Sequence, residues 1–258
     1  MRCPIHLSIG QELNAVALCE HLTVDDQMVS THRGHAHYLA KGGSLEKFIA
    51  ELHGKSTGCS GGLGGSMHLC SPDVGFMGST SIVGGTIPVG VGLAFANKLQ
   101  RKDDIVVVCL GDAAIEEGVF WESWNFAKLH KLKVLFFCEN NEFSCYTHIS
   151  ERQYENFLPS IATSIGPINS DDIKSKIDQA YHGNPSFVAI SSIRRVEHCG
   201  PDNDDHLGYK IQEYINAEAP LLDFKYDQTK LNEFKLEIES AFRFAEESPF
   251  PRKTVLFA

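Results

Sequence analysis

Residues 104–141, DIVVVCLGDAAIEEGVFWESWNFAKLHKLKVLFFCENN, decide the fold. The stretch begins with a continuous β-branched run at 104–110 and closes with a second apolar run at 133–139. Uninterrupted apolar runs of this length are typical of strands that are covered on both faces. Residues 114–131 lie between them and place four apolar side chains at helical spacing: Phe120, Trp124, Ala127 and either Leu129 or Phe126. The stretch therefore predicts a βαβ unit with parallel strands and a right-handed crossover.

The flanking sequence extends this unit into an α/β fold. Further helices are predicted at 9–21, 44–53, 84–99, 170–183 and 231–251, and a further parallel strand at 186–193. Residues 54–81 are expected to form a long Gly/Ser-rich loop, and 194–210 a polar loop. We expect a parallel sheet with helices on both faces, in a single domain over residues 1–258 with a C-terminal helical tail at about 211–258.

The composition and charge argue against some classes of binding partner. The 258 residues are 43% hydrophobic and 22% charged, which is ordinary for a globular domain with a full core. The formal net charge is −10 and no run of Lys or Arg exceeds two residues, so we expect no nucleic-acid partner. No apolar stretch approaches the roughly 18 residues of a membrane span, and the first ten residues lack a secretory signal.

The eight cysteines are scattered, without a C-x-x-C pair. Cys109 and Cys138 lie inside the apolar runs, where a thiol behaves as a small hydrophobic group. A chain with this pattern is expected to be reduced and cytoplasmic.

Two polar residues stand at the ends of the predicted strands. Asp112 follows the first strand and Asn141 follows the second, so both should emerge at the same edge of a parallel sheet, where ligands bind. Carboxylate and amide oxygens are hard ligands, suited to Mg²⁺ or Ca²⁺. The N-terminus of the predicted intervening helix would favour an anion. The pair therefore indicates a metal-bound diphosphate; the alternative is that Asp112 caps the helix and Asn141 makes a turn.

Residues 111–141 resemble the thiamine diphosphate motif in the α subunits of 2-oxo acid dehydrogenase E1 components, the family of pyruvate, branched-chain 2-oxo acid and acetoin dehydrogenases. Other segments fall in the order of that family: HLSIGQE (6–12), STHRGHAHYLAKG (30–42), AELHGKSTGCSGGLGGSMHL (50–69), SIVGGTIPVGVGLAFA (81–96) and RRVEHCGPDND (194–204). The resemblance covers most of residues 6–210. It implies a thiamine diphosphate-binding fold of the diphosphate-binding type, with thiamine diphosphate and Mg²⁺ as cofactors.

The resemblance also implies roles for individual residues. Asp112 and Asn141 match the residues that hold the divalent ion, and the main-chain carbonyl of Phe143 matches the third protein ligand, where the family has Tyr. Arg33 matches the arginine that binds the diphosphate through its fork of donors, and His32 stands where the family more often has Tyr.

Ala113 and Ala114 match residues whose backbone lies along the diphosphate, with Ala113 in place of the usual Gly, which requires a negative φ. Ser81 and Val83 match positions at the aminopyrimidine end of the cofactor.

Three more residues match the family's catalytic positions. His6 matches a histidine at the pocket shared by cofactor and substrate. Arg194 and His198 match a pair on the loop that reaches the diphosphate and organises the site for the lipoyl group.

The resemblance implies an oxidoreductase that acts on an oxo group and uses a lipoyl disulfide as acceptor. In the family, a β subunit supplies the carboxylate that activates the aminopyrimidine, so we expect an α₂β₂ heterotetramer that serves a lipoyl-bearing E2 acyltransferase. A split transketolase-like subunit is one alternative. A divergent, non-catalytic cofactor-binding or scaffold subunit is another, because HLSIGQE begins at residue 6 and the segment 147–185 is shorter than is usual in the family.

Two other patterns have competing interpretations. The segment HRGHAH (32–37) suggests a zinc cluster, but Arg33 within it and the family match favour a phosphate-binding loop. Glu116 and Glu117 are candidate acid/base residues, but their place in the first turn of the predicted helix favours a role as partners of the helix dipole.

Overall fold

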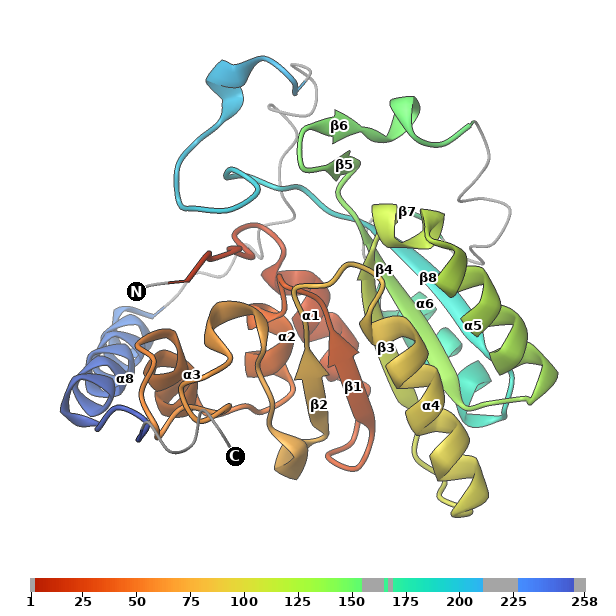
Figure 1. The fold of residues 1–258 in the computed structure, drawn as a ribbon, viewed down its shortest axis with the longest axis horizontal. Helices are drawn as coiled ribbons and strands as arrows, with labels where there is room; N and C mark the ends of the chain where they lie inside the picture. Colours follow the sequence, from red (N-terminus) through yellow and green to blue (C-terminus); the bar gives the residue numbers. More distant parts are fainter. Residues whose placement is uncertain (1–2, 155–164, 167–168, 211–226, 253–258) are drawn as a thin grey trace.

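A six-stranded sheet organises the chain in the computed structural model, which describes residues 3–154, 165–166, 169–210 and 227–252 (Figure 1). Every pair of neighbouring strands in it is parallel. In order across the sheet the strands are β2 (Phe76–Ser79), β1 (Gln27–Ser30), β3 (Val106–Gly111), β4 (Val134–Asn140), β8 (Ser186–Ser191) and β7 (Ile165–Gly166). The predicted parallel α/β fold is confirmed.

Helices pack on both faces of this sheet (Figure 1). One face is covered by α4 (Thr86–Leu99) and α5 (Gly118–Leu129). The core on the other face is built by α1 (Glu12–Cys19), α2 (His35–Ala40), α3 (Leu45–Leu52), α6 (Ser170–Tyr181) and α8 (Gln228–Glu247). Within the described residues, no helix has the length and apolarity needed to cross a membrane.

The burial of β3 explains why its sequence is an unbroken apolar run. Val107 and Cys109 belong to the core under α1 and α6, whereas Val106, Val108 and Leu110 belong to the core under α4 and α5. Successive side chains of a strand point to opposite faces, and both faces of this one are covered. The central strands therefore cannot alternate apolar and polar residues.

Five of the described strands were not predicted: β1, β2 and the two-residue strands β5 (Phe143–Ser144), β6 (Thr147–His148) and β7. β1 and β2 have four residues each, and β2 lies inside the segment 54–81 that was expected to be a loop. Their sequences, QMVS and FMGS, are too short and too rich in small or polar residues to stand out as apolar runs. The pairing of β1 with β3 stabilises an extended conformation that the local sequence does not predict.

The helix of the βαβ unit begins later than its sequence predicts. Residues Asp112–Glu116 form a 3₁₀ turn, Glu117 is extended, and α5 starts at Gly118. No acidic residue lies in the first turn of α5, so the predicted role of Glu116 and Glu117 as partners in that turn is wrong. Leu129, predicted on the buried side, is 73% exposed because it lies at the end of α5, beyond the packed face.

Two segments form a lobe above the carboxyl edge of the sheet (Figure 1). One is a hairpin of β5 (Phe143–Ser144) and β6 (Thr147–His148), and the other is the segment 194–210. Residues 211–226 of the predicted C-terminal tail lie outside the described residues. The helix of that tail, α8, packs on α3. Lys55 fixes the end of α8 by donating to the carbonyls of Glu246 and Ser248.

The approach of α4 to the sheet generates a stability prediction. A Cβ atom at Gly90 would lie 2.5 Å from Val108 Cγ2 and 2.8 Å from Val29 Cγ2, whereas one at Gly92 would meet nothing within 4 Å. Valine side chains in strands are stiff, so we expect Gly90→Ala to lower the free energy of unfolding by about 1–3 kcal/mol. Gly92→Ala, the matched control on the same helix, should raise it by about 0.5–1 kcal/mol. Denaturant unfolding of the full chain measures both; equal effects would contradict the close packing.

Candidate functional site

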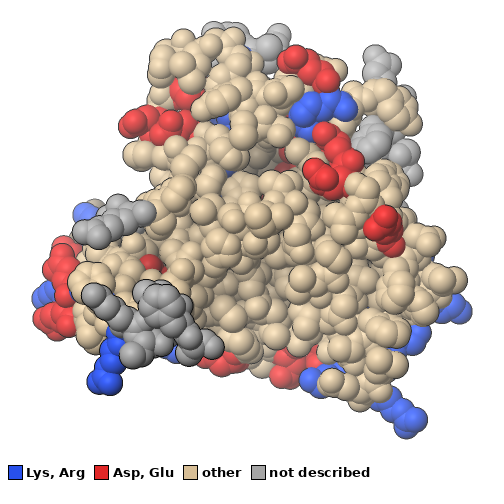
Figure 2. Space-filling model, in the orientation of Figure 1, with Lys and Arg blue, Asp and Glu red and all other residues tan. Residues whose placement is uncertain are grey.

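A cavity of about 370 Å³ lies at the carboxyl edge of β3 and β4. Figure 2 shows a hollow on this side of the molecule, beneath the lobe. Eleven of the twelve predicted site residues line the cavity: His6, His32, Arg33, Ser81, Val83, Asp112, Ala113, Ala114, Asn141, Phe143 and His198. The topology thus gathers residues from segments far apart in the chain into one place.

Asp112 stands at the end of β3 and is only 1% exposed. Burial raises the pKa of its carboxyl group, while the Arg152 guanidinium and the backbone N–H of Asn141 hydrogen-bond to it and oppose that rise. The hydrogen bond from Asn141 shows that the ends of β3 and β4 meet, as the sequence predicts.

Asn141 follows β4 in a tight turn. Its side-chain oxygen accepts a hydrogen bond from the backbone N–H of Phe143 at 3.0 Å, and Asn140 Oδ1 accepts one from Glu142 N at 3.1 Å. Glu142 has a φ of 65°, which closes the turn. An amide oxygen has two lone pairs, so Asn141 can make this turn and still offer an oxygen to a metal. The turn and the ligand role are therefore compatible.

A cation that the sequence did not reveal lies against Asp112. Arg152 Nη2 is 2.5 Å from Asp112 Oδ2, and Nη1 of the same side chain pairs with Glu116. Gln153 Nε2 donates to the Asp112 carbonyl at 3.1 Å and to Glu116 Oε1 at 2.8 Å. These contacts hold the chain after β6 against the 3₁₀ turn. No local pattern relates Arg152 to a carboxylate 40 residues earlier in the sequence.

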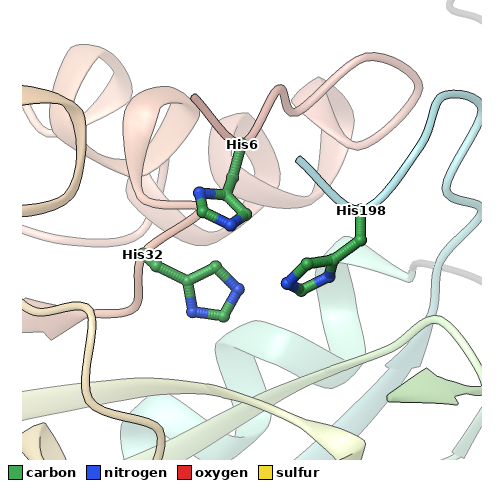
Figure 3. Close-up of side chains that lie close together, drawn as sticks. All are labelled: His6, His32 and His198. Carbon is green, nitrogen blue, oxygen red and sulfur yellow. The ribbon is translucent and has the colours of Figure 1, made fainter. Parts of the chain in front are cut away.

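Three histidines converge on the cavity (Figure 3). The ring centroid of His6 lies 4.6 Å from that of His32 and 4.9 Å from that of His198. The centroids of His32 and His198 are 5.5 Å apart. Burial, with the neighbouring positive charges, lowers the pKa of His6 to about 3 and those of His32 and His198 to about 4. All three imidazoles are therefore neutral at neutral pH.

The other histidines of HRGHAH do not join them. His35 Nε2 is 2.8 Å from Ser66 Oγ, and His37 Nδ1 is 2.9 Å from Ser30 Oγ. Both side chains are buried, and neither lines the cavity. The zinc cluster suggested by segment 32–37 alone is therefore not formed.

Arg33 links the segments that carry the three histidines. Its Nη1 donates to the carbonyl of Leu7 at 2.6 Å and its Nη2 to the carbonyl of His198 at 2.9 Å. Arg33 directly follows His32, so its guanidinium connects that segment to Leu7, next to His6, and to His198. The same group lines the cavity, where its positive charge is available to an anion.

Ala113, Ser81 and Val83 also line the cavity, and their roles toward a cofactor remain predictions. Ala113 lies in the 3₁₀ turn and is not among the non-glycine residues with positive φ, so the missing glycine introduces no strain. Ser81 Oγ lies 3.4 Å from His68 Nε2, and Val83 is exposed at the cavity wall.

Arg194 is the predicted site residue that does not line the cavity. It is buried in the lobe, where Nη2 donates to the carbonyl of Cys145 at 2.7 Å and to Tyr209 Oη at 2.5 Å, with the Asp204 carboxylate 3.8 Å away. These contacts join the β5–β6 turn to the segment that carries His198. A catalytic role for Arg194 remains a prediction, and its contacts are those of a positioning residue.

The comparisons with known proteins show the family of the chain. The family model described as "Dehydrogenase E1 component" matches residues 2–166. The chain belongs to that family. Among the similar proteins of this E1 family, the alpha subunit of acetoin:2,6-dichlorophenolindophenol oxidoreductase from Bacillus subtilis (strain 168) is 32% identical, over 98% of this chain and 83% of its own.

Two pyruvate dehydrogenase E1 subunits show the same breadth of match. The E1 component subunit alpha from Rickettsia bellii is 32% identical, over 98% of this chain and 85% of its own. The mitochondrial E1 component subunit alpha from Solanum tuberosum is 40% identical, over 98% of this chain and 70% of its own. This E1 family member is thus similar to alpha subunits along nearly its whole length.

The residues present fit the cofactor that the E1 family implies. Asp112 and Asn141 offer hard oxygen atoms at one end of the cavity, and Arg33 adds a cation for a diphosphate. The cavity volume of about 370 Å³ is within the range of small-molecule sites. His6, which is 7% exposed, has an Nδ1 atom without a hydrogen-bond partner among the described residues. A buried polar atom of this kind indicates a missing ligand.

The depressed histidine pKa values predict an acid-sensitive fold. The unfolded chain protonates these histidines near pH 6.5, and the folded E1 chain does so only near pH 3–4. Their contribution to the free energy of unfolding is therefore complete above pH 6.5 and is lost as the pH falls toward 4. In His32→Tyr, proton uptake on unfolding at about pH 5 should fall by about one proton.

The slope of unfolding free energy against pH, from denaturant titrations, measures this uptake. His182→Gln, an exposed histidine at the end of α6, is the control and should leave the slope between pH 6.5 and 4 nearly unchanged. An unaltered slope in His32→Tyr would show that His32 is protonated in the folded chain.

Proposed function

We propose that this chain is the alpha-type subunit of a 2-oxo acid or acetoin dehydrogenase E1 that holds thiamine diphosphate through Mg²⁺. The parallel pairing of β3 with β4 carries the proposal, because it brings Asp112 and Asn141 together in the cavity. The match to the E1 family and to alpha subunits supports it along nearly the whole chain.

In this proposal the metal is held by three oxygen ligands from the protein. Asp112 supplies a carboxylate oxygen, Asn141 a side-chain amide oxygen and Phe143 its main-chain carbonyl. Mg²⁺ takes its remaining ligands from phosphate and water, and Arg33 binds the diphosphate. Because Arg152 already pairs with Asp112, the metal either displaces that guanidinium or shares the carboxylate with it. Glu116 remains as the second partner of Arg152.

When bound, thiamine diphosphate supplies a carbon nucleophile for the 2-oxo group and an electron sink for decarboxylation. The protein residues orient the reactants and exchange protons. His6, His32 and His198 are neutral, so each can accept a proton or donate a hydrogen bond from its N–H to a developing negative charge. Ser81 and Val83 form the wall on the side proposed for the aminopyrimidine.

The proposal includes a β subunit, an α₂β₂ assembly and transfer of the acyl group to a lipoyl-bearing E2. The surface beside the cavity supports a protein partner, because Ile82, Val83 and Val89 are exposed there. Figure 2 shows that the face over the N-terminal half of α4 lacks charged side chains. A reducing compartment such as the cytoplasm is also proposed, and it is supported by eight free cysteines.

Removal of either predicted metal ligand tests the cofactor site. Wild-type protein should gain about 2.7 kcal/mol of stability when thiamine diphosphate, with Mg²⁺, is at 100 times its dissociation constant. Asp112→Ala and Asn141→Ala should lose this Mg²⁺-dependent gain, because each removes an oxygen ligand. Thermal unfolding with and without Mg²⁺ is the measurement.

Asp103→Ala is the matched control, since Asp103 is an exposed carboxylate before β3 that pairs only with Lys133 among the described residues. It should retain the full gain. Stabilisation of both site variants to the wild-type level would refute the proposed ligands.

Reconstitution with a β subunit tests the enzymatic role. The isolated chain should neither decarboxylate pyruvate or branched-chain 2-oxo acids nor cleave acetoin, and adding a cognate β subunit should restore turnover with a lipoyl acceptor. Release of CO₂ from labelled 2-oxo acid is the readout. Activity of the chain alone would contradict a site shared between subunits, and inactivity of a complex that binds cofactor would favour the non-catalytic alternative.

A further inference from the structure

The three histidines at the cavity form a group that the proposed cofactor site does not require as a set. One ring nitrogen of each of His6, His32 and His198 lies within 4.8 Å of one ring nitrogen of each of the others. Figure 3 shows the rings, from three separate segments, arranged around a common space. All three line the cavity, so a ligand placed among them would face its interior.

Backbone and side-chain contacts hold these segments together before any ligand binds. Arg33 bridges the carbonyls of Leu7 and His198, and the backbone N–H of Gly200 donates to the carbonyl of Ile5 at 2.9 Å. The segments on either side of His6 and His198 are therefore fixed to each other. Little chain entropy remains to be lost when the imidazoles approach one another.

We propose that His6, His32 and His198 together bind a borderline transition-metal ion, with Zn²⁺ as the representative, at a site distinct from the oxygen ligands of Asp112 and Asn141. Neutral imidazoles suit zinc, cobalt, nickel and copper, whereas carboxylate and amide oxygens suit Mg²⁺. Three histidines around one ion leave a coordination position open, as in sites that exchange a ligand.

The geometry requires a small contraction. Zinc–nitrogen bonds of about 2.0–2.1 Å place tetrahedral ligand atoms roughly 3.3 Å apart, closer than the 4.8 Å limit within which the nitrogens lie. His198 lies on a loop and His32 before α2, so side-chain rotations can supply this movement. The unpartnered Nδ1 of His6 would gain a partner if that atom binds the metal.

Charge both favours and opposes the ion. The three imidazoles carry no proton that a metal must displace at neutral pH. Arg33 lies beside them and repels a cation, whereas the carboxylates of Glu139 and Asp112 line the same cavity and attract one. A weak, exchangeable site follows from this balance, in contrast to a closed structural zinc site.

Cobalt provides the direct test, because its visible spectrum reports ligand type and geometry. Titration of the cofactor-free full chain with Co²⁺ should give one equivalent of a tetrahedral species that Zn²⁺ displaces, without a thiolate charge-transfer band. His32→Tyr and His198→Gln should each weaken binding by at least about 100-fold, since removing a ligand costs more than removing a group behind it. His182→Gln should bind as wild type. Circular dichroism and the midpoint of thermal unfolding check that each variant is folded.

Two results would overturn the site. One is wild-type cobalt affinity in both His32→Tyr and His198→Gln. The other is a thiolate band that disappears in Cys199→Ser, which would assign the ion to the cysteine next to His198. Because the titration uses no thiamine diphosphate, it decides the histidine site even if the proposed E1 function fails.

The functional consequence rests on the proposed function. An ion held by the three histidines would occupy space at the reaction face, so Zn²⁺ should inhibit the reconstituted enzyme at saturating Mg²⁺ and thiamine diphosphate. Inhibition, expressed as a fraction of each protein's own activity, should weaken by the same factor as cobalt binding in His32→Tyr. Equal inhibition of wild type and His32→Tyr would show that zinc acts elsewhere.

Discussion

The parallel pairing of β3 with β4 is the constraint on which the site depends. Its register sets Gly111 beside Glu139, so the residues that follow each strand emerge as neighbours. The sheet thereby brings together an acid and an amide that a whole helix separates in the chain. Side chains from α4 and α5 cover one face of these strands and those from α1 and α6 the other, and this packing keeps the register from slipping.

A buried carboxylate at that junction needs a positive partner. Asp112 is almost fully enclosed, and in the structure Arg152 provides the charge that compensates it. In the proposed metal site a divalent ion would neutralise this carboxylate instead, and Glu116 would remain as a partner for the guanidinium. The position of the chain after β6 would then depend on what occupies the proposed site, since Arg152 and Gln153 attach that chain to the 3₁₀ turn.

The sequence predicted the parts of the molecule that local patterns encode. Long apolar runs identified β3 and β4, and the polar residues after them identified Asp112 and Asn141. The short strands β1 and β2 escaped because tertiary pairing, not composition, makes them strands. Arg152 could not be found, because its contact depends on how separate loops fold back over the sheet edge. The family resemblance assigned His6, His32 and His198 to the cofactor site, but no local pattern predicted that their rings lie together.

The way in which Arg33 is anchored bears on how freely its surroundings can change. Its Nη1 and Nη2 atoms donate to main-chain oxygens, at Leu7 and His198. A peptide carbonyl is present whatever side chain the residue bears. A substitution at position 198, which lines the cavity, can therefore alter the chemistry presented there without removing the carbonyl that holds Arg33. The side chain that faces a ligand can thus evolve while the backbone contact stays the same.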